Sequence, residues 1–425
     1  YTRGEKHLER IYMNITNPFA PHMSGQLSEE TQVLVAEQIA KGTLSPYACK
    51  NEDIIRRDSS HDQASLLRPA FMRDVEKIMH TPAYNRLNGK TQVFSFRAHD
   101  DITRRGLHEQ LVCRVAKDIG RALGLNLDLI EAIALGHDVG HTPFGHAGEY
   151  FLNDMYHEQT GRWFFHNVQS VRVLDGLYAR NLSLQTLDGV ICHNGEFEQQ
   201  VLQMSDLSTF DEFDKVVEDC WERGPQAIAH LRPMTLEGCV MRISDIIAYV
   251  GKDRQDALRA GAATEETFDD GLGGAYNAWA TSAFVADIVE NSFGKPQISL
   301  SEEAFKEMKR AKRENYQKIY GASEANGDFS EDIKHLFEKL YEYELSSLKS
   351  GDQSLAIFKH HIEPVSRHLS RYGHTYDWKS DLHRTVVDFI SAMTDDYFVA
   401  TCEALFPEAQ ELFPKRSYFA EGVRA

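Results

Sequence analysis

The sequence predicts an all-α fold, and three observations support this prediction. Apolar residues recur at steps of four between residues 102 and 123, so that one helix face would carry Leu107, Leu111, Val115, Ile119 and Leu123. Gly124 follows this periodic segment, as glycine often follows the last turn of a helix. Runs of alternating apolar and polar residues, which would indicate strands, are not prominent in the chain.

Further segments are predicted to be helical in the same way. The first covers residues 28–40, with Gly42 as its stop. Residues 127–135 are apolar enough for a buried helix, which would place His137 and Asp138 at its C-terminal end. Other predicted helices cover residues 147–156, 167–178, 235–259 and 301–320.

The chain is predicted to divide into three segments. Its 425 residues suffice for two packed sub-domains. Glycine-containing polar breaks at residues 264–276 and 321–330 indicate connections between packed parts. We therefore expect an N-terminal extension over residues 1–60, a core over 61–262 and a C-terminal helical region over 263–425.

The composition is typical of a globular protein, with 42% hydrophobic and 26% charged residues. No apolar run approaches the roughly 20 residues that cross a bilayer, so we expect no membrane contact. The net charge of −18 disfavours a broad nucleic-acid surface, although contact with a single strand stays open. The six cysteines are scattered without a CxxC pair, which favours a reducing, cytoplasmic setting over a disulfide framework.

Residues 137–149 form the densest group of chemically active side chains, with three histidines and two carboxylates in thirteen residues. The adjacent His137 and Asp138 can ligate one metal ion, because imidazole and carboxylate together suit several divalent metals. The glycines and Pro143 interrupt the helix, so His141 and His146 can point into a pocket. Simple capping of helix ends by these histidines is the less favoured interpretation.

Two further ligands are expected from other helices, His108 on the preceding one and Asp245 on a later one. Two imidazoles and two carboxylates leave open positions on an octahedral ion, where water and a phosphate oxygen would bind. The ligand types are compatible with Mn, Mg, Fe, Co, Ni or Zn and do not choose among them.

The pattern resembles the HD-domain phosphohydrolases and, among them, the deoxynucleoside triphosphate triphosphohydrolases, or dGTPase-like proteins. The resemblance extends over about residues 70–260 and lies in segments 86–94, 105–108, 137–149 and 165–167, and in Asp245, Tyr249 and Asp253. It implies an HD-domain helical bundle that hydrolyses a deoxynucleoside triphosphate, with dGTP as a candidate. The expected products are the deoxynucleoside and tripolyphosphate, formed by water attack at the α-phosphorus.

The resemblance also implies roles for individual residues. The metal ligands would be His108, His137, Asp138 and Asp245. His146 and Glu149, three residues apart on one helix face, would form the catalytic dyad, and His166 would join this network or contact phosphate. Arg105, His141 and Lys252 are the expected phosphate ligands.

Sugar recognition would fall to four residues. Asp245, Tyr249 and Asp253 recur every four residues; on spacing alone, Tyr249 is equally well a core residue and Asp253 a solvated charge. The resemblance favours Tyr249 against deoxyribose, Asp253 and Gln92 at the 3′-hydroxyl, and Val93 excluding ribonucleotides. An apolar contact of this kind rejects a hydroxyl only about 10²-fold, so Val93 and Tyr249 would need to act together.

The chain departs from the family pattern next to His108, where Glu109 stands in place of the usual serine. We expect Glu109 to face solvent, with contact to the metal ligands as the alternative. His193 also matches a family position, and we assign it no role. Other hypotheses are an HD-domain enzyme acting on a monophosphate or cyclic nucleotide, and a non-catalytic dNTP sensor. We also expect a homo-oligomer.

Overall fold

The computed structural model describes residues 26–96, 100–194, 199–269, 271, 277–320 and 329–413. These residues form mainly helices, which confirms the all-α prediction. The first group of helices is α2 (Glu29–Lys41), α3 (Met72–Met79), α4 (Pro82–Arg86), α5 (Arg105–Leu123), α6 (Leu127–Gly136), α7 (Gly145–Thr160), α8 (His166–Val171), α9 (Leu184–Ile191), α10 (Phe210–Arg223) and α11 (Pro225–Ile228). The second group is α12 (Leu236–Arg259), α13 (Asn277–Ser292), α14 (Glu302–Asn315), α16 (Phe329–Ser350), α17 (Glu363–Ser370), α18 (Leu382–Ser391), α19 (Asp395–Leu405) and α20 (Ala409–Leu412).

Shorter turns connect several of these helices. Tight 3₁₀ turns lie at Asn51–Asp53, Leu87–Gly89 and Glu265–Thr267, and π-helical turns at Arg172–Leu177, Tyr316–Tyr320 and Phe358–Ile362. The predicted helix over 147–156 corresponds to α7, and the one over 235–259 to α12. The predicted helices over 167–178 and 301–320 each correspond to an α-helix and the π-helical turn that follows it, α8 in the first case and α14 in the second.

The ends of α2 and α5 follow the sequence signals. At the start of α2 the Ser28 hydroxyl accepts a hydrogen bond from the Thr31 amide. Gly42 and Gly124 follow α2 and α5 in the left-handed conformation, with φ angles of 62° and 70°. Gly42 and Gly124 are therefore the predicted stops, whereas Ser28, expected as the first residue of the helix, is its N-cap.

The helix α5 begins three residues later than the sequence predicts. The backbone of Arg104 is extended, so Arg105 is the first helical residue. Ile102 instead packs with Phe94 and Ile319 in a small cluster separate from the main core. The predicted helix therefore began too early, because Ile102 is apolar to pack in this small cluster and not to form part of the helix face.

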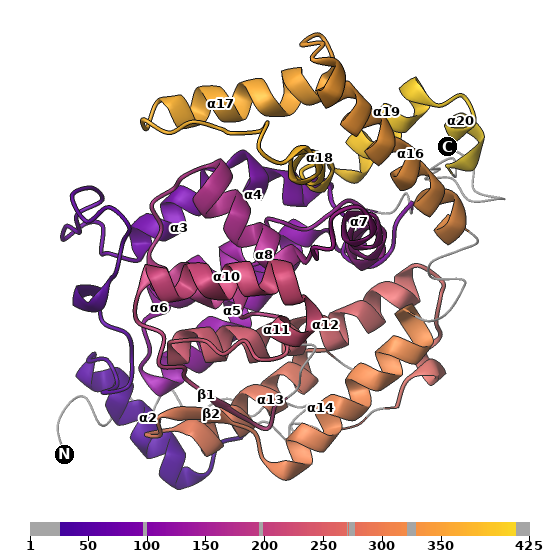
Figure 1. The fold of residues 1–425 in the computed structure, drawn as a ribbon. Coiled ribbons are helices and arrows are strands. Elements are labelled where there is room, and N and C mark those ends of the chain that lie inside the picture. Colours follow the sequence, from indigo (N-terminus) through magenta and orange to yellow (C-terminus); the bar gives the residue numbers. More distant parts are fainter. Residues whose placement is uncertain are drawn as a thin grey trace.

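Helices α5, α6 and α12 form the centre of the molecule. α12 packs against α5, α6, α9 and α13, and α5 also packs against α6. Figure 1 shows this central group between α13 and α14 on one side and the C-terminal helices on the other. Because the expected metal ligands lie on α5, directly after α6 and on α12, the mutual packing of these helices sets the geometry of the site.

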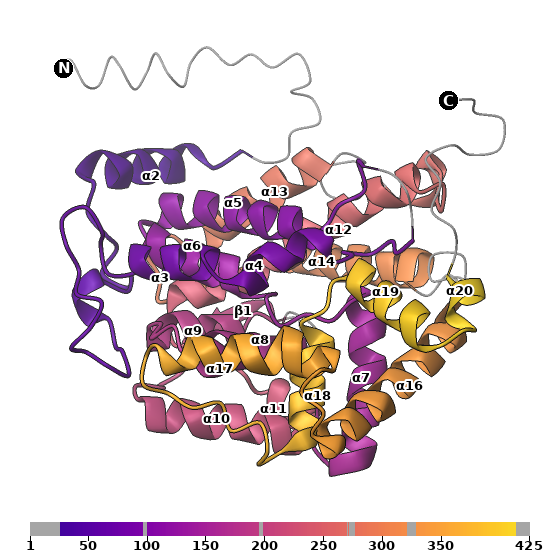
Figure 2. The ribbon, with the colours of Figure 1, turned by 90° about the horizontal axis from the view of Figure 1, so that it is seen from above.

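The C-terminal helices cover the central group. Both α16 and α18 pack against α7, and the two ribbon views show α17 lying over the layer that contains α4 and α8 (Figures 1 and 2). One hydrophobic cluster runs from Val35 to Phe413. In the two predicted breaks, residues 270, 272–276 and 321–328 lie outside the described residues.

A small antiparallel sheet is present that the sequence did not predict. Strand β1 (Val201–Gln203) pairs with β2 (Gln297–Ser299), and Leu202 lies opposite Ile298. Each strand has only three residues, too few to show an alternating pattern.

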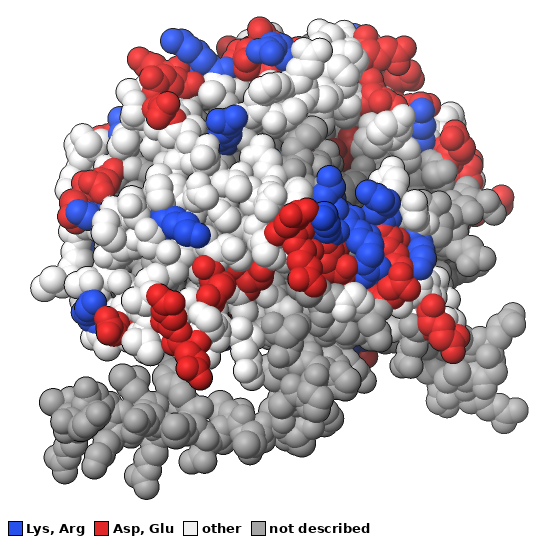
Figure 3. Space-filling view, turned by 90° about the horizontal axis from the view of Figure 1, so that it is seen from below, with Lys and Arg blue, Asp and Glu red and all other residues white. Residues whose placement is uncertain are grey.

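The described surface carries both signs of charge. On the face shown in Figure 3, basic side chains gather in one group beside acidic ones and are otherwise scattered. Ion pairs on α14, such as Arg310 with Glu307, join neighbouring charges of opposite sign. No helix among the described residues has the length and apolarity to cross a membrane.

The buried carboxyl group of Glu237, in the first turn of α12, provides a test of how this central helix packs. Its Oε1 accepts hydrogen bonds from the amides of Cys49 (3.1 Å) and Asn126 (2.9 Å), while its Oε2 has no partner. Burial raises the pKa of Glu237 to about 7. The folded state then holds this proton more tightly than the unfolded state, so its contribution to stability falls as the pH rises from 4.5 towards 7.

We expect Glu237→Gln to remove this part of the pH dependence, because the amide keeps an acceptor oxygen and carries no charge. Between pH 5 and pH 8, the free energy of unfolding of the variant should increase by about 2 kcal/mol relative to that of the wild type. Urea unfolding at several pH values measures the difference, with the exposed Glu303→Gln as control. Parallel profiles for the wild type and Glu237→Gln would contradict the expectation.

Candidate active site

Three helices bring the four expected metal ligands together. His108 lies in the first turns of α5, His137 and Asp138 directly follow α6, and Asp245 lies within α12. Ligand atoms of His108, His137 and Asp138 lie within 4.8 Å of one another. His108 Nε2 is 3.0 Å from Asp245 Oδ1, which places the fourth residue beside the other three.

The buried ring of His137 fits a metal site. Its Nδ1 lies 2.7 Å from the carbonyl oxygen of Ala134 and therefore carries the hydrogen, which leaves Nε2 with a free lone pair. This Nε2 is buried without a hydrogen-bond partner, 3.7 Å from Asp138 Oδ1 and 3.9 Å from Asp245 Oδ1. A bare imidazole nitrogen facing two carboxylates is the donor set that a divalent cation requires.

Arg105 and Glu109 surround Asp138. Arg105 Nη1 forms a buried ion pair with Asp138 Oδ2. Burial opposes the charge of Asp138, yet Arg105 and the neighbouring histidines hold its pKa well below the usual value. The expectation that Glu109 faces solvent is wrong: it is fully buried, and its Oε1 accepts a hydrogen bond of 3.2 Å from the Asp138 amide.

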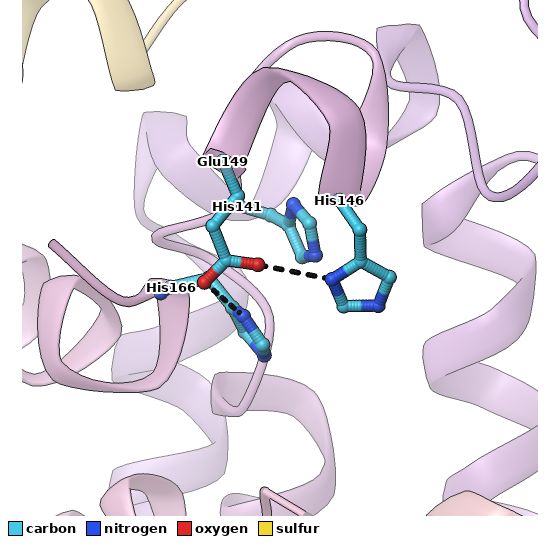
Figure 4. A group of neighbouring side chains, drawn as sticks. All are labelled: His141, His146, Glu149 and His166. Carbon is cyan, nitrogen blue, oxygen red and sulfur yellow. Dashed lines mark hydrogen bonds and ion pairs between the residues drawn. The ribbon is translucent and has the colours of Figure 1, made fainter. Parts of the chain in front are cut away.

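The expected dyad and His166 form one hydrogen-bonded network. Glu149 lies between the two histidines, with Oε2 2.9 Å from His146 Nδ1 and Oε1 2.8 Å from His166 Nδ1 (Figure 4). The His166 amide also donates to Glu149 Oε1 at 2.7 Å. Burial disfavours the charge of Glu149, but His166 and the hydrogen bonds from both rings lower its pKa well below the usual value.

The two outer parts of this network differ in exposure. The side chain of His146 is 68% exposed, whereas His166 is buried. Burial lowers the pKa of His166, but the charge and hydrogen bond of Glu149 raise it overall to about 9. The network therefore runs from the protein surface to the buried cluster, where His166 Nε2 lies 3.7 Å from Asp138 Oδ1.

His141 lies beside this network without joining it (Figure 4). Its ring stacks on that of His166, with the ring centroids 4.4 Å apart. Both ring nitrogens are buried and have no hydrogen-bond partner among the described residues. Burial, together with Arg105 and His166, lowers the pKa of His141 well below its usual value, so the ring is neutral and has one N–H to donate.

The residues expected at the sugar lie around the second half of α12. Asp253 is buried, and its Oδ2 accepts a hydrogen bond from the Tyr320 hydroxyl. Val93 packs against the same small cluster as Tyr320, and Tyr249 packs at the edge of the main core. Burial raises the pKa of Asp253 to about 6.

Two expected substrate ligands are already engaged with other protein groups. The Lys252 ammonium pairs with Asp256, one turn further along α12. Arg105 lies near the backbone oxygens of Thr91 and Gln92, at 3.3 and 3.5 Å, in addition to its ion pair.

A distant helix holds the loop that carries the histidines. Asp395, in the first turn of α19, accepts hydrogen bonds from the amides of Thr91 and Phe144, each at 3.0 Å. Phe144 has a φ angle of 60°, which is unfavourable for a residue with a side chain. The buried Lys90 ammonium donates to the carbonyls of His141 and Ser391. Contacts from the C-terminal helices therefore fix the loop before α7.

Comparisons with known proteins agree with this geometry. A model of the HD domain matches residues 107–249. A deoxyguanosinetriphosphate triphosphohydrolase-like protein of Caldanaerobacter subterraneus subsp. tengcongensis is 31% identical over 379 residues, which cover 88% of this chain and 95% of the relative. The chain belongs to this family.

Other members of the deoxyguanosinetriphosphate triphosphohydrolase-like family show similar agreement. The Clostridium perfringens strain SM101 member is 32% identical over 347 residues, covering 78% of this chain and 85% of the relative. The Desulfatibacillum aliphaticivorans member is 29% identical over 386 residues, covering 87% and 96%. The chain is accordingly an HD-domain phosphohydrolase, and its HD match spans all four expected metal ligands.

Three further side chains of this family member contact the site: Glu109, His193 and Asp395. The sequence analysis expected Glu109 at the surface and gave the other two no role. His193 Nδ1 lies 2.6 Å from the Val190 carbonyl oxygen, so its Nε2 accepts the hydrogen bond of 3.0 Å from His166 Nε2. The match of His193 to a family position was the available signal. Asp395 had none, because it lies about 250 residues from the loop it holds.

Proposed function

We propose that this phosphohydrolase cleaves deoxynucleoside triphosphates to the deoxynucleoside and inorganic tripolyphosphate. The observation that carries the proposal is the network of His146, Glu149 and His166, which links an exposed imidazole to the buried His/Asp cluster. A metal ion activates water for attack on a phosphate, and a positioned imidazole beside it can carry the proton that the leaving group needs. The printed names of the relatives support dGTP among the candidate substrates.

The buried cluster would hold one divalent ion through His108, His137, Asp138 and Asp245. When bound, the ion supplies Lewis acidity at a phosphate oxygen and promotes ionisation of water. The donor set is compatible with Mn, Mg, Fe, Co, Ni or Zn. Glu109 would orient this cluster through the Asp138 amide.

The remaining residues would position the triphosphate and move a proton. Glu149 orients His146 through Nδ1, so that Nε2 transfers a proton to the 5′-oxygen as it leaves. His141 would donate its ring N–H to a phosphate oxygen, because both of its nitrogens lack a protein partner. Arg105 and Lys252 would add positive charge from their ion pairs with Asp138 and Asp256.

Sugar selection would depend on Gln92, Val93, Tyr249 and Asp253. Gln92 Oε1 and Asp253 Oδ1 are buried without hydrogen-bond partners in the part of the chain that the structure describes, so each can accept a hydrogen bond from a 3′-hydroxyl. Val93 and Tyr249 would crowd the 2′ carbon and select against ribonucleotides.

Product analysis tests the proposal directly. The full chain is incubated with each dNTP and Mn²⁺ or Mg²⁺, and the products are separated by ion-exchange chromatography. We expect deoxynucleoside and tripolyphosphate, with the order of rates giving the base preference. Monophosphate with pyrophosphate would contradict the scissile bond, and no turnover with any dNTP, alone or mixed, would favour the dNTP sensor.

A further inference from the structure

A separate cavity lies between the core and the C-terminal helices. Its volume is about 260 Å³, and it lies between α4, the segment that ends at Tyr178, α17 and the end of α18. None of the proposed metal, dyad or substrate residues lines it. The cavity is therefore distinct from the candidate active site.

The lining of this cavity is strongly basic. Arg86, Lys90, Arg367 and Arg371 line it together with three histidines, and no aspartate or glutamate in the described segments does. The whole chain has a net charge of −18, so this basic group has the opposite sign to the overall charge of the protein. The side chains of Arg86, Arg367 and Arg371 form no ion pair with any of the described residues.

Lys90 adds a buried charge to this wall. It is 1% exposed, and its ammonium donates to the carbonyl oxygens of His141 and Ser391 rather than to a carboxylate. Burial, with Arg86 and Arg105 nearby, lowers its pKa to about 7. An anion in the cavity would favour the charged form of this side chain, which donates to the carbonyl oxygen of the loop residue His141.

The other side chains in the wall include Val139, Val173, Leu177 and Val365. Guanidinium groups bind phosphate oxygens through paired hydrogen bonds, and the apolar wall can cover an organic part. We propose that this cavity is a binding site for a small phosphorylated anion, separate from the active site. Orthophosphate, tripolyphosphate and a nucleotide share this chemistry.

Calorimetric titration of the full chain in EDTA tests the proposal, because turnover is then suppressed. The titrants are sodium orthophosphate, sodium tripolyphosphate and each dNTP. The test variant is Arg367→Gln/Arg371→Gln, since both residues are exposed and their replacement should not disturb folding. The control is Arg114→Gln/Arg121→Gln, which removes the same charge from the exposed face of α5.

We expect the wild type and the control to bind at least one of these anions with equal affinity. The Arg367→Gln/Arg371→Gln variant should bind the same anion at least tenfold more weakly. The titrant that binds most tightly identifies the source of the phosphate group. Absence of binding to the wild type at millimolar concentration, or equal binding by the two double variants, would overturn the proposal.

Discussion

Replacement of His146 by alanine is expected to lower turnover about 10²- to 10⁴-fold, while the protein keeps its metal. His146 is the only exposed member of the network with Glu149 and His166, so its loss removes the proposed proton donor without opening the buried cluster. The rate of tripolyphosphate release from dGTP and the metal content by mass spectrometry together measure this effect.

A matched control exists on α16, where His335 and Glu338 also stand three residues apart and lie 3.8 Å from each other. His335→Ala should leave turnover unchanged. Because the proposed dyad of His146 and Glu149 would act as a unit, Glu149→Gln should add little to the effect of His146→Ala. Near-normal turnover in His146→Ala would show that the proposed dyad is wrong.

Loss of the metal, and with it all turnover, is the expected result of Asp245→Asn. The substitution keeps the shape of the side chain but removes the charge facing His108 and His137. Metal affinity should fall by more than the roughly 10- to 100-fold that partners outside the ligand set contribute. Titration of the metal-free protein with Mn²⁺ measures the affinity directly.

Glu237→Gln provides the control on the same helix, because it also neutralises a buried carboxyl group of α12 but lies outside the cluster. It should bind Mn²⁺ as the wild type does. Wild-type metal affinity in Asp245→Asn would remove Asp245 from the ligand set and leave His108, His137 and Asp138 as the candidates.

Local patterns predicted the central helices well. The periodicity before Gly124, the stop at Gly42 and the apolar segment before His137 each depend on neighbours within a few residues. The run 137–149 likewise revealed its chemistry, because its histidines and carboxylates are close in sequence. The structure places these side chains in contact, and their roles in catalysis stay predictions.

Contacts between distant segments were beyond such patterns. Glu109 was expected at the surface because charged residues usually are, yet the Asp138 amide and the packing of α5 on α6 bury it. Asp395 and the basic cavity also depend on contacts between distant segments, since the walls of the cavity come from residues 82–178 and 360–392. A single sequence contains no signal of which segments will meet.

The hydrogen bonds from Asp395 have a consequence for the order in which the protein is made. All four proposed metal ligands have been synthesised once residue 245 is added, but the strained backbone at Phe144 lacks its acceptor until residue 395 follows. At about 5–20 residues per second, the ribosome needs roughly 8–30 s for this interval. During that time the nascent chain carries the histidines of the loop without the contact that holds them. On the proposed function, catalytic competence should therefore appear only when the last helices are synthesised, and unfinished chains should hydrolyse no nucleotide.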